Sequence, residues 1–195
     1  RLIRDFPQSP YADRGQYQMA FSIFKQSSPV HLTQDKTFEA IRELQIFLDE
    51  NPDSEMAPEA IKLLQTCLDK VAEKDYKIGY LYLKMHDWEA ARLYLTELLE
   101  EFPMSNWASK AQYRIAESYA REEKWEEAIE QYSIYLQSYF DEELQEKARK
   151  RLEEIKLYYA EEPKDMDEDH PDLINGVPGT PTLTNTPSDT GANTP

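Results

Sequence analysis

Apolar residues recur along this chain at intervals of three and four, the spacing that places side chains on one face of a helix. In two segments a small residue, Ala40 or Ala91, is followed by large apolar residues four and seven positions later. Each segment reaches a proline twelve residues after the small residue, at Pro52 and Pro103. Proline stops a helix because it lacks an amide donor and restricts the residue before it. The pattern therefore predicts amphipathic helices that share one end signal.

A second helical pattern precedes these helices and makes the arrangement repeat. Ahead of Ala91 and Ala128, large, small and aromatic residues follow in the same order and at the same distances. The two resulting units, 72–105 and 109–142, are each 34 residues long and lie 37 residues apart. This length and order are the signature of tetratricopeptide (TPR) repeats, which stack as helical hairpins. The matching residues are Ile78, Gly79 and Tyr82 in one unit and Ile115, Ala116 and Tyr119 in the other.

The remaining apolar stripes extend this array in both directions. A stretched unit near 9–54 contains an irregular loop at 27–34, and an extra helix is expected at about 56–71. A closing helix at 141–160 has one apolar face and charges elsewhere, as the polar end of a repeat array requires. We therefore expect an all-α, TPR-type helical-hairpin solenoid over residues 1–160, with an inserted helix and a C-terminal capping helix.

The composition changes from about residue 161 to Pro, Thr, Gly, Asn and Asp, and aromatic residues are absent. Such a segment cannot bury enough apolar area to offset the entropy of the chain. Residues 161–195 are therefore predicted to form a disordered Pro/Thr-rich tail. This tail holds eight of the 38 acidic residues and, as its one Lys or Arg, Lys164. Much of the acidity of the chain is thus local.

The net charge of -16, from 38 acids and 22 Lys plus Arg, argues against nucleic-acid binding. Phosphate contacts dominate that kind of affinity and need a basic face. No apolar run approaches the roughly 20 residues that span a bilayer. The chain opens at Arg1–Pro7 with what reads as the end of a helix. We expect the true N-terminus, with any targeting signal or lipid anchor, to lie outside this sequence.

Catalysis and metal binding have no candidate residues in this sequence. The single cysteine, Cys67, lies on an apolar stripe and is expected to be a buried, inert thiol. His31, His86 and His170 are isolated, whereas a metal site needs at least three converging donors. No nucleophile–base pair or phosphate-binding loop is visible. We therefore expect no metal ion, no cofactor and no enzymatic activity.

Helix positions that do not pack between helices line the concave surface of a TPR array, and here they are rich in aromatic and cationic residues. Such residues suit an extended peptide with aromatic side chains and a terminal carboxylate, although each aromatic could instead pack on a neighbouring helix. Arg92 and Arg114 could pair with acids of a partner, or with Glu89 or Glu117 in the chain itself. The candidate groove residues are Tyr17, Phe21, Phe24, Lys25, Tyr76, Tyr80, Lys84, Lys110, Tyr113 and Arg121.

The order of these features resembles the BamD family of outer-membrane assembly lipoproteins. The resemblance runs from Tyr17 to about Tyr132, and a plain TPR protein would not be expected to have both the long loop and the extra helix at these points. The residues that carry it are the aromatic-rich helix Tyr17-Gln18-Met19-Ala20-Phe21, the loop end Gln34-Asp35-Lys36-Thr37, the helix stop Asn51-Pro52-Asp53-Ser54, the long helix running towards Ala72-Glu73-Lys74, and the aromatic stretch from Tyr76 to Lys84.

This resemblance implies a scaffold on the periplasmic face of the outer membrane, tethered by a lipid anchor that this chain lacks. Members of the family bind the periplasmic domains of a BamA-type barrel protein through their C-terminal repeats and act beside other assembly-machine lipoproteins. Their N-terminal repeats receive C-terminal targeting strands of unfolded outer-membrane proteins. The acidic tail is not a feature of the family, and the first one or two repeats of a full-length relative are expected to be missing.

Three other functions fit parts of the pattern. Another periplasmic TPR scaffold of the cell envelope would share the repeats, but the long loop and extra helix favour the BamD family. A cytosolic chaperone adaptor clamps carboxylates with asparagines and lysines, where this chain has Tyr76, Tyr80 and Tyr113. An enzyme with an appended TPR region would carry its catalytic residues in a domain outside this sequence.

Overall fold

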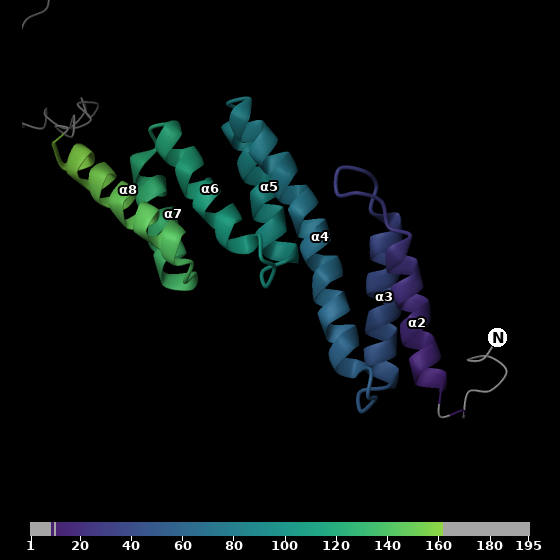
Figure 1. Cartoon of the computed structure of the whole chain (residues 1–195). Coiled ribbons are helices and arrows are strands. Elements are labelled where there is room, and N and C mark those ends of the chain that lie inside the picture. Colours follow the sequence, from purple (N-terminus) through teal and green to yellow (C-terminus); the bar gives the residue numbers. More distant parts are fainter. Residues whose placement is uncertain (1–8, 10, 162–195) are drawn as a thin grey trace, which may run out of the picture. The chain divides into compact units, whose positions relative to one another are not determined.

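The computed structural model describes residue 9 and residues 11–161, and within them the chain forms helices and no strand (Figure 1). The all-α fold predicted from the sequence is therefore confirmed. The expected helix end at 1–7 and the expected disordered tail beyond residue 161 lie outside the described residues. The helices are α2 (Ala12–Lys25), α3 (Asp35–Glu50), α4 (Ala57–Lys84), α5 (Trp88–Glu101), α6 (Ala108–Arg121), α7 (Trp125–Ser138) and α8 (Glu142–Glu161).

Each described helix packs against the next one along the chain, as in a TPR solenoid. Further contacts join α2 to α4, α4 to α6 and α6 to α8. Among α3, α5 and α7 no comparable contacts occur. The even-numbered helices therefore form the inner layer of the array and the odd-numbered helices form the outer layer.

Small residues allow the paired helices to approach closely. Ala40, Ala91 and Ala128, which begin the repeated small–large pattern, are fully buried. At Gly79 on α4, an added Cβ would lie 2.7 Å from Leu95 Cγ and 3.3 Å from the carbonyl oxygen of Ala91 on α5. The small residues of the repeat thus lie where the two helices of a hairpin come close enough for side chains to meet the backbone of the other helix.

The helix predicted at about 56–71 does not end where the next unit was expected to begin. It continues as α4, a single helix of 28 residues. No proline or glycine interrupts the chain between residues 59 and 78, and the buried stripe of Cys67, Val71 and Ala72 crosses the predicted boundary. The inserted helix and the first helix of the 72–105 unit are therefore one element.

Helices α4 and α6 end with the same backbone motif, at positions 37 residues apart. His86 after α4 and Glu123 after α6 both have φ of 61°. In each turn the following amide donates to the carbonyl oxygen five residues earlier, at 3.1 Å after α4 and 3.0 Å after α6. This is the Schellman cap, in which the left-handed position usually belongs to glycine. The two hairpins therefore repeat in backbone conformation as well as in sequence.

Candidate functional site

Two neighbouring hollows on the inner layer share Arg114 of α6 as a common wall. The Lys84 hollow has a volume of about 260 Å³ and the Lys110 hollow one of about 330 Å³. The Lys84 hollow is lined by Tyr80, Leu83, Lys84, His86, Trp88, Arg114, Glu117 and Arg121. The Lys110 hollow is lined by Tyr76, Trp107, Lys110, Tyr113, Arg114, Asp141, Glu143 and Leu144.

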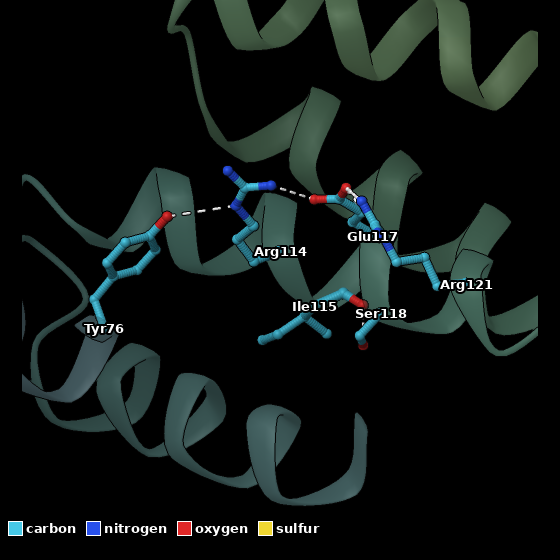
Figure 2. Close-up of polar contacts among 6 residues, drawn as sticks. All are labelled: Tyr76, Arg114, Ile115, Glu117, Ser118 and Arg121. Carbon is cyan, nitrogen blue, oxygen red and sulfur yellow. Dashed lines mark hydrogen bonds and ion pairs between the residues drawn. The ribbon is translucent and has the colours of Figure 1, made fainter. Parts of the chain in front are cut away.

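The guanidinium of Arg114 is held from several directions. Its Nε donates to the hydroxyl of Tyr76 at 3.4 Å, and its Nη1 pairs with Glu117. Figure 2 shows these two partners on opposite sides of the group. The guanidinium carbon lies 5.1 Å from the ring centroid of Tyr80 and 5.8 Å from that of Tyr113. Its orientation is therefore set within the chain, before any partner arrives.

Glu117 is shared between two arginines. Its second oxygen accepts from Nη2 of Arg121 at 2.8 Å, so one carboxylate joins two cations along the helix. Burial alone raises the pKa of Glu117, but the hydrogen bonds from Arg121 and Arg114 outweigh it and hold this pKa below its ordinary value. Burial likewise opposes the charge of Arg114, whose pKa is nevertheless raised by Tyr76 and Glu117. Arg114 and Glu117 are therefore both charged at neutral pH.

Half-buried aromatic rings lie beside the Arg114–Glu117–Arg121 group. Tyr76 stacks on Tyr80 with ring centroids 6.1 Å apart and lies 4.9 Å from the ring of Trp107. Tyr113 meets the buried rings of Tyr132 and Tyr135 edge-on, each at 5.8 Å. Burial and the nearby Glu117 carboxylate raise the pKa of Tyr113. Tyr76, Tyr80 and Tyr113 therefore pack on neighbouring rings and also line the hollows.

Cations give the Lys84 hollow a local charge opposite to that of the chain as a whole. Its walls carry three of them, from Lys84, Arg114 and Arg121, against the single carboxylate of Glu117. Lys84 Nζ lies 4.7 Å from the ring centroid of Tyr80. The chain as a whole has a net charge of -16. An anionic group of a partner is therefore attracted to this hollow in particular.

A third hollow, between α3, α4 and α5, has the opposite character. Its charged residues are Lys74 and the three acids Asp75, Glu97 and Glu101. Burial, followed by repulsion from Glu101 and Glu97, raises the pKa of Asp75. The inner hollows at Arg114 thus differ in charge from the surface between α3 and α5.

The candidates on α2 are not part of this site. Tyr17 lies 6.3 Å from both Phe21 and Phe47, and it packs against the core. Lys25 Nζ lies 5.0 Å from the ring centroid of Phe21. Phe24 packs against the same core. The structure therefore separates the predicted groove residues into an α2 group and an α4–α6 group, and only the second lines the two hollows.

A family model for YfiO, described as an outer membrane lipoprotein, matches residues 1–112, which is more than half of the chain. The chain belongs to the YfiO family. A tetratricopeptide repeat model matches residues 110–141. No curated protein matches the chain.

The YfiO match confirms the resemblance to the BamD family that the sequence showed. It covers α2 to α5 and the first residues of α6, while the repeat match covers the rest of α6 and α7. The family places this chain among lipoproteins of the outer membrane, and its repeats indicate protein–protein interaction.

Arg92 of this YfiO-family chain has an internal partner. Its Nη1 lies 2.7 Å from Glu122 Oε2, and its guanidinium carbon lies 4.3 Å from the ring centroid of Tyr119. The side chain of Arg92 is 13% exposed. The partner is therefore Glu122, rather than Glu89 or Glu117, and the charge is balanced within the chain.

Several lining residues were not found from the sequence. Trp107 stands three residues before Lys110, whose Nζ lies 4.6 Å from the Trp107 ring centroid. That helical spacing was a signal that could have placed Trp107 beside Lys110. Asp141 immediately precedes α8, and Glu143 and Leu144 lie in its first turn. They line the Lys110 hollow because α8 packs on α7 and α6.

Among the residues that the structure describes, no group of three or more His, Cys, Asp or Glu side chains is arranged to hold a metal ion. None of the helices described has both the length and the apolar character needed to cross a bilayer. Cys67 is fully buried, and burial raises the pKa of its thiol to about 12.

Proposed function

We propose that this YfiO-family chain is a non-catalytic scaffold of the outer-membrane β-barrel assembly machine. In this proposal its repeats bind the periplasmic domains of a BamA-type barrel protein, and other lipoproteins of the machine join the same complex. The family match and the TPR repeats support it. The lipoprotein description of the family supports a position on the periplasmic face of the outer membrane, with attachment through a lipid anchor.

The proposal extends to unfolded outer-membrane proteins, whose C-terminal targeting strands would be received on the inner layer. The single observation that carries this part is the pair of hollows around Arg114. Their aromatic walls supply contact area at low entropic cost, and their cations supply charge pairing with a carboxylate. A general periplasmic TPR scaffold of the cell envelope is the second candidate, favoured by the repeat match at 110–141 alone.

Co-purification tests the scaffold role. The full-length protein carrying an affinity tag is isolated from detergent-solubilised membranes under conditions that preserve membrane complexes. The expected result is recovery of a BamA-type barrel protein in the same fraction. Recovery of envelope proteins without any barrel protein would instead favour the general scaffold and remove the assembly-machine assignment.

Peptide binding tests the role of the inner layer separately. The variant Tyr76→Ala with Tyr80→Ala should bind a peptide ending in an aromatic residue more weakly, with its helical circular dichroism retained. Phe38→Ala is a suitable control, because Phe38 is 49% exposed on α3 and lines neither inner hollow. If the double variant binds as tightly as the control, the inner layer is not the receptor for such peptides.

A further inference from the structure

We propose that Arg114 is a preset receptor for the side-chain carboxylate of an Asp or Glu within an extended segment of a partner protein. The residues on either side of that acid would fill the Lys84 and Lys110 hollows. This inference deepens the proposed function and rests on it for the kind of partner. It adds the chemical group that the inner layer recognises.

The guanidinium of Arg114 has one edge that no described residue occupies. Nε and Nη1 of Arg114 are engaged by Tyr76 and Glu117, whereas Nη2 has no hydrogen-bond partner among the residues that the structure describes. In Figure 2 this nitrogen is joined to no other group. The Arg114 side chain is 31% exposed, so the edge is accessible. An arginine edge of this kind binds a carboxylate through charge-assisted hydrogen bonds.

Binding at this edge costs little side-chain conformational entropy. The guanidinium lies over the rings of Tyr80 and Tyr113 and is tied down at two of its nitrogens. Little side-chain freedom remains to be lost when a partner binds, and this favours affinity. Lysine at this position would present a point charge without the planar edge.

The charge balance around Arg114 is positive by one. Glu117 already pairs with Arg114, but the same carboxylate also pairs with Arg121, so two arginines share one acid. The cations that line the two hollows are Lys84, Lys110, Arg114 and Arg121, and the acids are Glu117, Asp141 and Glu143. A carboxylate of a partner would balance the one cation in excess.

The position of Arg114 between the two hollows favours an acidic side chain within a segment over a terminal carboxylate. Arg114 forms part of both hollows, so an occupant of the two must continue on both sides of the group that Arg114 binds. A terminal carboxylate ends the chain at Arg114 and leaves one hollow unfilled. In an extended segment, residues two positions apart share a face, so an acid and its neighbours at ±2 can all reach the surface.

Three N-acetylated peptides can serve as probes: two heptapeptides with an amidated C-terminus and one tetrapeptide with a free C-terminus. The first is acetyl-Ser-Tyr-Ser-Glu-Ser-Tyr-Ser-amide, and the second replaces its Glu by Gln. The third, acetyl-Ser-Tyr-Ser-Tyr, has a free terminal carboxylate and no acidic side chain. Trp88 and Trp107, one in each hollow, provide a fluorescence signal for titration of the full chain.

The expected result is that the Glu probe binds about tenfold more tightly than the Gln probe, a ratio typical of one hydrogen-bonded charge. The terminal-acid probe should bind no better than the Gln probe. Arg114→Gln should abolish the preference for Glu, so that this variant binds the Glu and Gln probes with equal affinity. Arg114→Lys should keep only part of it. Arg42→Gln is the matched control for net charge, because Arg42 lies on α3 and lines neither hollow.

Equal affinity for the Glu and Gln probes would overturn the inference, as would no binding of any probe. A preference for Glu that survives in Arg114→Gln, or tightest binding of the terminal-acid probe, would also overturn it. Co-purification of the barrel protein is scored separately. A barrel protein recovered without a Glu preference removes only the carboxylate receptor, whereas a Glu preference without a barrel protein removes the proposed assembly-machine role.

Discussion

Arg92 on α5 and Glu122 at the end of α6 form an ion pair of 2.7 Å that joins one helical hairpin to the next. The hydrogen bond from Lys124, together with that from Arg92, outweighs burial and lowers the pKa of Glu122. Arg92 also covers the ring of Tyr119 at 4.3 Å. The side chains of Arg92 and Glu122 are 13% and 28% exposed, so this partly buried pair is screened less than a fully exposed pair. Removing one partner should therefore destabilise the fold.

The variant Arg92→Ala should therefore lower the free energy of unfolding by about 1–3 kcal/mol, since it leaves Glu122 without a partner on α5 and uncovers Tyr119. Urea denaturation followed by circular dichroism measures this change. Arg149→Ala is the control, because Arg149 is exposed on α8 and, among the described residues, donates only to Gln145. The control should lose less than about 0.5 kcal/mol. An Arg92 variant as stable as the control would show that the pair contributes nothing.

The contact of Gly79 with Leu95 leads to a second prediction. Gly79→Ala gains about 1 kcal/mol in helix propensity, but its Cβ would meet the fully buried Leu95 at 2.7 Å, an overlap that costs about 1–3 kcal/mol. The single variant should be less stable than the native chain. In a Leu95→Ala background the same change should become neutral or stabilising. A double-mutant cycle in urea measures this coupling, and simple additivity would rule out the overlap.

The left-handed conformation of Glu123 leads to a third prediction. A side chain at φ of 61° costs about 1 kcal/mol that glycine avoids, so Glu123→Gly should stabilise the chain by up to that amount. Glu123→Ala keeps a Cβ and should bring no gain. His86→Gly should gain less, since it also removes the stacking of His86 on Trp88 at 5.2 Å. Melting temperatures of the three variants decide the matter.

Cys67 leads to a fourth prediction, which concerns pH. Its pKa is raised from 9.0 to about 12 by burial, so the folded chain favours the neutral thiol. The stability that this preference contributes is complete below pH 9.0 and is lost as the pH rises towards 12. The native chain should therefore lose more stability than Cys67→Ala over this range. Iodoacetamide should label Cys67 at pH 8 in urea and not in buffer, and rapid labelling in buffer would contradict the burial.

The repeat register could be derived from the sequence because it is local. The small residues Ala40, Ala91 and Ala128 are buried wherever the pattern places them, since each allows one close helix contact. The boundary expected near residue 72 was wrong for a physical reason that the sequence also contains. Nothing between residues 59 and 78 breaks a helix, but the regular length of the repeats suggested a start there.

In the candidate site, too, some features follow from local spacing in the sequence and others depend on packing between hairpins. Tyr76 and Tyr113 stand 37 residues apart, as do Lys84 and Arg121, so the repeat itself brings both pairs to one layer. The Arg92–Glu122 pair and the α8 wall of the Lys110 hollow depend instead on how one hairpin packs on the next. No local spacing encodes that packing. On α2, the same spacing rule selected Tyr17, Phe21 and Phe24, which pack against the core that contains Phe47.

The continuity of α4 gives the array a mechanical property that separate hairpins lack. At about 1.5 Å per residue its 28 residues make a rod roughly 42 Å long. The same rod contacts α2 and α3 as well as α5 and α6. No proline or glycine interrupts it between residues 59 and 78. We therefore expect a displacement of α4 by a partner at its Lys84 end to be passed on to α2 and α3, which pack on the same helix.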